Sequence, residues 1–377
     1  MSEPDNSRAG AVPERAQTDA DVWQSGQRDT TMGLTRRGWT ITLSVIMAAV
    51  FVAVGMLVRV PYVALGPGPT YDTLGVTADG PVIKIDGTKS YETSGELRLT
   101  TVSLSDDVQL IKGLGMWISG RYALAPRELY FPPGETEQEV EEQNARQFQN
   151  SQSSAEVAAL SYLDYPTKVI AQEVVSDGPS SDVLRSGDVL VAVDGTKVSS
   201  TEDVHKVLND TRPGDVITVS YRRDGTLTRD KKVTLGDAGD GREQGYMGLL
   251  LTDRAKVDFE IDIELADIGG PSAGLMFAVA IVDRLTPGKL TGGERVAGTG
   301  EIADNGKVGP IGGIQFKLVA AKEDGATTFL VPKDNCAEAV RTAPDGMRLV
   351  RVDTLDDAVS ALETIADGGK ARTCAAS

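Results

Sequence analysis

The sequence predicts an α+β protein that follows one membrane-spanning helix near the N-terminus. Three observations lead to this class. An uncharged apolar run covers residues 39–58. Short alternating patterns typical of strands recur between residues 81 and 265, and two glycine pairs, at 269–270 and 312–313, precede helical patterns. The 377 residues suit two or three domains.

The run from Trp39 to Val58 has the length and composition of a transmembrane helix. As a helix, its 20 residues rise about 30 Å, which matches the hydrocarbon core of a bilayer. Two alternatives compete. A cleaved signal peptide has a shorter apolar region and a small-residue cleavage site, which Val63-Ala64-Leu65 fits poorly. A buried core helix is rarely so uniformly apolar beside a polar tail.

Flanking arginines predict the orientation of this helix. Only Arg59 closely follows the apolar run. Five arginines precede it: Arg8, Arg15, Arg28, Arg36 and Arg37. The positive-inside rule then keeps the N-terminus in the cytoplasm and places the chain from about residue 60 onward outside the cell membrane.

Composition excludes several classes of site and partner. The net charge of −17 disfavours binding to the phosphate backbone of nucleic acid. With one histidine, His205, and two cysteines, Cys336 and Cys374, the chain lacks the clustered ligands of a Cys/His zinc site, and no metal is expected. The two cysteines lie in a compartment that permits disulfides, so they either pair or remain free thiols.

Residues 166–235 carry the pattern of a peptide-binding module. The segment 186–195 alternates tightly and ends in an Asp-Gly turn. It resembles the core of a bacterial PDZ domain, a module that binds extended peptides beside a helix. That helix is expected near residues 202–208, with Val204 and Leu208 lining the groove and His205 on the same helix. Alternatively, the module is only a spacer.

Ser272 is a candidate nucleophile. Residues 267–274 read DIGGPSAG and precede the apolar pattern LMFAVAIVDRL. Gly269 and Gly270 permit a sharp turn, and Pro271 suits a first helical turn. A serine at a helix start is often only an N-cap, but free N–H groups there also stabilise an oxyanion.

Lys317 is the candidate base. It follows the glycine pair 312–313 on a helical pattern and shares a face with Gly313, Ile314, Ala320 and Ala321. Burial of that face lowers a lysine pKa, and a neutral lysine accepts a proton from a serine hydroxyl. The alternative is a lysine whose amine reaches the surface.

Together the segments GPSAG, TGEI at 299–302 and GKVGPIGGIQFKLVAA resemble the proteolytic domain of the Lon peptidases. The resemblance implies a Ser-Lys dyad at Ser272 and Lys317, with Thr299 beside the lysine and Gly270 in the nucleophile loop. Gly269 departs from the acidic residue that the family often carries three positions before its serine. No GxxxxGK[ST] loop is present, so neither ATP nor another cofactor is expected.

The order of segments is similar to that of the Lon-like PDZ peptidases of bacteria. It implies an ATP-independent, membrane-anchored serine endopeptidase that cleaves exported or membrane proteins delivered by its PDZ domain. The expected boundaries are a disordered cytoplasmic tail at 1–38, the transmembrane helix at 39–59, extracytoplasmic strands and a linker helix at 60–165, the PDZ domain at 166–235, the peptidase domain at 236–368 and a tail at 369–377.

Two rival functions remain at this point. The chain is otherwise a non-catalytic, PDZ-based peptide-binding membrane protein with a relic peptidase domain, or a peptidase that processes only itself. The expected partners are protein or peptide substrates and the lipid bilayer, through residues 39–58. The sequence leaves open the substrate, the cleavage specificity, the regulation and the oligomeric state, with a homo-oligomer among the alternatives.

Overall fold

The computed structural model describes residues 36–77, 80–265 and 268–375. The chain divides into two units, Met1–Val54 and Gly55–Ser377. Helix α1 spans Arg36–Leu57, and its part from Arg37 is long and apolar enough to cross a membrane. Most of the predicted disordered tail, including Arg8, Arg15 and Arg28, lies outside the described residues.

A six-stranded sheet forms the centre of the second unit. Its strand order is β18-β17-β14-β5-β1-β6. Strands β5, β14, β17 and β18 run parallel, whereas β1 pairs antiparallel with β5 and β6. The strands are β1 Tyr62–Asp72, β5 Glu96–Ser105, β6 Ala123–Pro126, β14 Arg295–Gly298, β17 Thr328–Pro332 and β18 Arg348–Val352.

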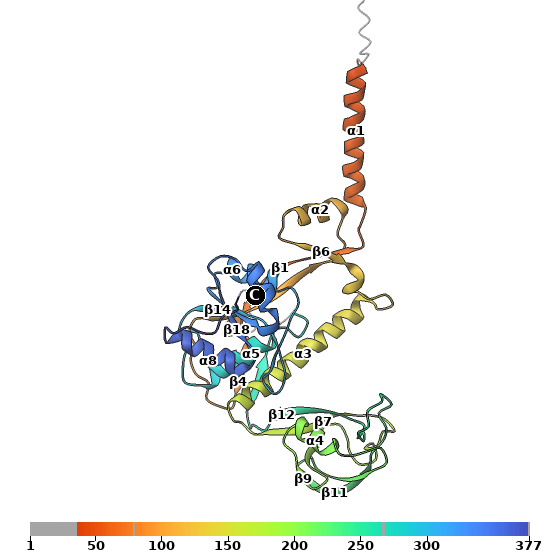
Figure 1. The fold of residues 1–377 in the computed structure, drawn as a ribbon, viewed down its shortest axis with the longest axis vertical. Coiled ribbons are helices and arrows are strands. Elements are labelled where there is room, and N and C mark those ends of the chain that lie inside the picture. The colour runs from red at the N-terminus through yellow and green to blue at the C-terminus, as the bar shows by residue number, and fades with distance from the viewer. Residues whose placement is uncertain (1–35, 78–79, 266–267, 376–377) are drawn as a thin grey trace, which may run out of the picture. The chain divides into compact units, whose positions relative to one another are not determined.

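Helices cover both faces of this sheet (Figure 1). Because successive strand residues point to opposite faces, Leu330 packs with one group of helices and its neighbour Phe329 with another. The first group is α3 Glu137–Tyr162, α5 Gly274–Leu285 and α8 Leu355–Ala366; the second is α6 Ile314–Glu323 and α7 Cys336–Thr342.

Short elements complete this unit. Helix α2 spans Leu110–Ile118, and the 3₁₀ turns η1 and η2 span Arg127–Leu129 and Lys333–Asn335. Three two-stranded ladders pair β2 Val76–Thr77 with β3 Gly80–Pro81, β4 Ile83–Asp86 with β13 Glu260–Ile263, and β15 Glu301–Ile302 with β16 Val308–Gly309.

A separate sheet of order β11-β10-β8-β7-β12, with β9 on β8, forms the module predicted as a PDZ domain. Its two ends are adjacent, because the Lys256 N–H donates to the Pro166 carbonyl at 2.7 Å. The module is therefore an insertion in the larger unit. Its elements are β7 Thr167–Val174, β8 Val189–Val193, β9 Thr196–Lys197, α4 Thr201–Leu208, β10 Val216–Arg223, β11 Thr226–Thr234 and β12 Leu249–Ala255.

The linker helix expected within residues 60–165 is α3, and it is only partly exposed. A capping box between Thr136 and Glu139 starts α3, and the first turns are exposed. Further along, Phe148 and Ser151 are buried, and Phe148 meets Phe277 of α5 edge to face at 5.8 Å. The local pattern of α3 is polar because only one stripe of its second half contacts α5.

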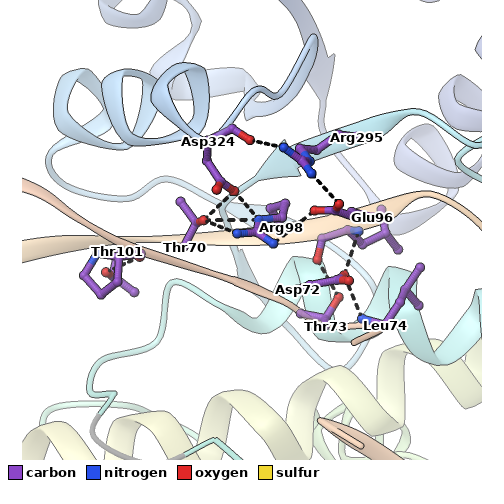
Figure 2. Close-up of polar contacts among 11 residues, drawn as sticks. Thr70, Asp72, Thr73, Leu74, Glu96, Arg98, Thr101, Arg295 and Asp324 are labelled. Carbon is purple, nitrogen blue, oxygen red and sulfur yellow. Dashed lines mark hydrogen bonds and ion pairs between the residues drawn. The ribbon is translucent and has the colours of Figure 1, made fainter. Parts of the chain in front are cut away.

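A polar network connects strands from the two ends of the sequence (Figure 2). Glu96 on β5 accepts hydrogen bonds from Arg295 on β14 at 2.6 Å and from Arg98 at 3.0 Å. Arg98 pairs in turn with Asp324, the residue that ends α6. These side chains are partly exposed, so each pair contributes little alone, but as a group they hold α6 against β5 and β14.

Because β5 lies beside β14, we expect that residues 236–377 do not fold alone. That fragment lacks β1, β5, β6 and α3, and with them Leu97 and Leu99, which are fully buried. Each such leucine contributes about 1.5–3 kcal/mol, a large part of a typical stability of about 5–15 kcal/mol. Circular dichroism should show no cooperative thermal transition for 236–377, whereas the fragment 60–377 unfolds cooperatively. A cooperative transition in the short fragment would contradict this.

Candidate active site

Ser272 lies in a turn directly before α5, two residues outside the helix. The N-cap position belongs to Ala273, which has no capping side chain, so the structure rules out an N-cap role for Ser272. Pro271 likewise precedes the helix and does not occupy its first turn. Gly270 has φ +84°, in the left-handed region that favours glycine, and this residue turns the chain toward Ser272.

Lys317 lies on α6, one turn after the N-cap residue Gly313. Gly313 has φ +70°, and a Cβ there would meet the Val102 side chain at 2.8 Å, so the helix start requires glycine. Lys317 is only 2% exposed, which excludes the alternative of an amine that reaches the surface. Its Nζ stands 2.7 Å from Ser272 Oγ.

Burial alone lowers the pKa of Lys317 from about 10.5 to about 7. The cause is desolvation, which disfavours the charged ammonium. At neutral pH a large share of the amine is therefore uncharged, with a lone pair that can accept the Ser272 proton.

Thr299 orients both partners. Its hydroxyl accepts a hydrogen bond from Lys317 Nζ at 2.8 Å and donates one to the Ser272 carbonyl at 3.0 Å. The Gly300 N–H donates to the same carbonyl at 2.9 Å. Thr299 follows β14 directly and is fully buried, so the end of that strand fixes the distance between the amine and the hydroxyl.

Helix α3 holds the nucleophile loop from the other side. The Gly270 N–H donates to the Asn144 carbonyl at 3.0 Å, and Ser151 Oγ donates to the Pro271 carbonyl at 3.0 Å. In a trans peptide the C=O and N–H point in opposite directions. The Ser272 N–H therefore points away from Ser151, and it has no hydrogen-bond partner among the described residues.

This arrangement corrects one expectation about the oxyanion site. Free N–H groups were expected around the helix start that follows the glycine pair. The Gly270 N–H is already used by Asn144, and Pro271 has none. The Ser272 N–H is the one donor of that segment left to face a reacting carbonyl oxygen.

The dyad opens into a cleft of about 460 Å³. Residues from β1, β5, η1, α3 and the loop before α6 form its walls. They include Pro69, Tyr71, Leu99, Val102, Tyr130, Asn144, Gln147 and Ile311. Ser272 and Lys317 both line this cleft, so a molecule bound in it lies beside the dyad.

A second hollow, of about 370 Å³, lies between α4 and β12 in the inserted module. His205 and Leu208 line it from α4, and Leu249 to Leu251 from β12. Val204, which was expected to line this groove, is fully buried in the core of the module. Val204 and Leu208 are one turn apart on α4. The side chain of Val204 packs in the core of the module, whereas that of Leu208 also lines the hollow.

Two family models match parts of this chain. Residues 265–364 match the model of the Lon protease (S16) C-terminal proteolytic domain, and residues 140–234 match that of the PDZ domain. Residues 265–364 are thus similar to a Lon-type proteolytic domain. The expected fold class and both module types are thereby confirmed.

Curated relatives are similar over part of the chain. The Lon protease of Campylobacter concisus is 41% identical over 92 residues, which is 23% of this chain and 11% of that protein. The Lon protease of Haemophilus influenzae is 30% identical over 174 residues, which is 41% of this chain and 21% of that protein. The chain thus spans a small part of the length of these relatives.

Among solved structures, the PDZ domain of an SdrC-like protein from Listeria monocytogenes is 23% identical. The match covers 22% of this chain and 86% of the Listeria chain, with a TM-score of 0.21. The corresponding domain from Listeria innocua is 21% identical, covers 22% of this chain and 92% of that chain, and has the same TM-score.

Other expected site residues are also described. A disulfide joins Cys336 on α7 to Cys374, and the Cys374 N–H donates to the Leu349 carbonyl, so the C-terminal segment lies along β18. Among the described residues, no group of three or more His, Cys, Asp or Glu side chains is placed to hold a metal ion.

Sequence reasoning missed the part of the site that precedes the Lon-type domain. Asn144 and Ser151 hold the nucleophile loop, and Tyr71 and Leu99 line the cleft, yet all stand more than a hundred residues before Ser272. No local motif marks them. The one available signal was the run of small residues at 151–159 in α3, which indicates close packing against another helix.

From the lowered pKa of Lys317, we expect the rate of peptide hydrolysis to rise as pH increases through about 7 and then to level off. The amine gains its base form above that value. Lys317→Arg should be inactive, because a guanidinium stays protonated. Lys322→Arg, an exposed change on the same helix, is the control. A rise only near the ordinary lysine pKa of about 10.4 would contradict a desolvated base.

Ser151 is expected to act as a positioning residue. Without its hydrogen bond to Pro271, the Ser272 N–H is less well aimed at the oxyanion, which exists only in the transition state. Ser151→Ala should therefore lower kcat by about tenfold, at the upper end of the roughly 0.5–1.5 kcal/mol of one hydrogen bond, and leave KM unchanged. The pH midpoint should stay near 7. Ser153→Ala is the control, and a matching loss there would mean general disturbance of α3.

Proposed function

We propose that this chain is a membrane-anchored serine endopeptidase that works with a Ser272–Lys317 dyad and without ATP. The observation that carries the proposal is the 2.7 Å contact between Ser272 Oγ and the Nζ of a buried lysine whose pKa is lowered to about 7. The match to a Lon-type proteolytic domain supports it.

In the first step, neutral Lys317 takes the proton of Ser272 Oγ, which attacks the carbonyl carbon of a bound peptide. The new C–O bond places negative charge on the carbonyl oxygen, and the Ser272 N–H stabilises that charge. One such donor typically contributes about 10²–10³-fold. Thr299 keeps the amine in place through its contacts with Lys317 and with the Ser272 carbonyl.

In the second step, the C–N bond breaks and the Lys317 ammonium returns its proton to the leaving amine. An acyl ester on Ser272 remains. A water molecule then attacks the ester while Lys317 accepts one of its protons, and the proton passes back to Ser272 Oγ as the acid product leaves. The protein ends with the protonation states of the start.

The PDZ domain is proposed to deliver the substrate. Strand β12 ends its sheet, with β7 on one side and the groove toward α4 on the other. An extended peptide there would add a strand to β12 and contact Leu208 and Leu250. Bound substrate would thereby be concentrated beside the cleft.

The membrane anchor and its orientation complete the proposal. Helix α1 is long and apolar enough to span a bilayer, and the arginines around it favour a cytoplasmic N-terminus. The PDZ and Lon-type domains would then stand outside the cytoplasm. Their substrates would be loose segments of exported or membrane proteins.

Covalent labelling tests the dyad. A fluorophosphonate probe should react with the full chain in detergent and label neither Ser272→Ala nor Lys317→Ala. The same two variants should lose hydrolysis of an unstructured peptide while keeping the circular dichroism of the unaltered protein. Lack of labelling of the unaltered chain would favour a relic domain, and labelling without hydrolysis of added peptide would favour a self-processing protein. Either result would overturn the proposal.

We expect substitution of the groove to affect delivery and not chemistry. Leu250→Glu places a charge in the groove at an exposed position. It should lower kcat/KM for a protein substrate severalfold and leave kcat/KM for a short peptide unchanged. Val216→Glu, also exposed but on the distant strand β10, is the control. Equal losses on both substrates would show that the PDZ domain supports the active site structurally.

A further inference from the structure

Helix α2 exposes an apolar face. Leu110, Leu114, Trp117 and Ile118 are 49–70% exposed. They follow one another at spacings of four, three and one, so they lie on one stripe of the helix. Four large apolar side chains on one short helix form a patch that water solvates poorly.

Two residues of α2 contact the rest of the protein. Gly113 is buried, and a Cβ there would meet the Val108 side chain at 2.9 Å. Ile111 packs so closely on Gly55 that a Cβ at residue 55 would stand 2.7 Å from it. Gly113 and Ile111 lie on the two sides of the exposed stripe, so these contacts hold α2 along the flanks of the stripe and leave the stripe itself free.

The beginning of α2 is bonded to the end of the apolar run. The Leu110 N–H donates to the Val58 carbonyl at 3.0 Å, and the Val60 N–H donates to the Val108 carbonyl at 2.9 Å. Val58 is the last residue of that run. The first residue of α2 is therefore hydrogen-bonded to the last residue of the apolar run.

The turn η1 also lies beside the end of the apolar run. The Arg127 N–H donates to the Pro61 carbonyl at 3.1 Å, which holds η1 beside the membrane exit, and the neighbouring Leu129 is 71% exposed. Tyr62, paired with Pro126 across β1 and β6, is also exposed. Exposed apolar and aromatic side chains thus gather where the span ends, as interfacial residues do.

We propose that the exposed stripe of α2 enters the surface of the same bilayer that α1 spans. The inference rests on the proposed membrane anchor. A lipid surface is the fitting occupant because α2 begins at Val58, and because Lys112, the one charged residue of α2, lies off the apolar stripe. With α1 spanning the bilayer and α2 lying in its surface, the part of the protein outside the membrane is held at a constant distance from the bilayer surface.

The proposal also specifies the substrate class. Strand β1 leads from Pro61 to Pro69 and Tyr71 in the wall of the cleft. Pro69 follows Pro61 by eight positions, which is at most about 26 Å of extended strand. The cleft accordingly stands within reach of the bilayer surface, and its substrates are protein segments that emerge from the same membrane close to the lipid.

Tryptophan fluorescence tests the placement of α2 in the full chain. The chain has tryptophan at positions 23, 39 and 117, so two double substitutions to phenylalanine leave Trp117 or Trp39 alone. In vesicles of phospholipid brominated at stated depths, Trp117 should be quenched by shallow bromines and protected from aqueous iodide. Quenching of Trp117 by iodide alone, or by neither, would overturn the proposal; the second result would indicate a protein contact, such as a second copy.

The Trp39 variant separates this inference from the anchor. If bromolipids quench Trp39 and not Trp117, α1 is inserted and the proposed role of α2 is wrong. If they quench neither, the membrane anchor itself fails, and the inference fails with it. If they quench both, both statements hold.

A functional test uses substrates tethered to the vesicle. One cleavable segment is placed at increasing numbers of residues from a transmembrane anchor. The unaltered chain should cleave within a limited window of spacer lengths, whereas L114E/W117E should lose that window and cleave the near-membrane segment severalfold more slowly. Hydrolysis of a soluble peptide should not change, and Val216→Glu should behave as the unaltered chain. An unchanged window in L114E/W117E would overturn the proposal.

Discussion

The parallel pairing of β5 with β14 is the constraint on which the rest of the structure depends. It aligns Glu96–Leu99 with Arg295–Gly298, two segments about two hundred residues apart in the sequence. Below the pair, α5 and α3 bury one apolar face; above it, α6 covers the other. The ion pairs of Glu96 with Arg295 and of Arg98 with Asp324 join the same elements along their edge (Figure 2). Removing this pairing would separate the two walls of the cleft.

The chemistry of Lys317 follows from that arrangement. Ser272 precedes α5, which covers one face of the sheet, and Lys317 lies on α6, which covers the opposite face. The two side chains meet at the end of β14, where Thr299 contacts both residues. The apolar packing around α6 removes water from the amine and lowers its pKa to about 7. A charged partner would have raised that pKa again. The site instead surrounds the amine with two hydroxyls, which hold its position and carry no charge of their own.

The sequence allowed the α+β class, the apolar helix and both module types to be predicted, because each depends on short-range patterns. The pair of Ser272 and Lys317 was accessible because each follows a pair of glycines next to a helical pattern, and the structure brings the two together. Asn144, Ser151 and the strands before the PDZ domain were not accessible, since their role depends on pairing across an insertion. Val204 was misplaced for another reason: helical spacing tells which residues share a face, but not whether that face meets the groove or the core.

The insertion between Pro166 and Lys256 also fixes when this protein acquires its chemistry during biosynthesis. Strands β1, β5 and β6 of the central sheet are synthesised first, and the PDZ domain, whose two ends are joined by a hydrogen bond, follows them. Strand β14 and helix α6 are synthesised only after the PDZ domain. Until they arrive, Ser272 has no lysine beside it and β5 has no parallel neighbour. The contact between Ser272 and Lys317 can therefore form only after the whole PDZ domain has been synthesised.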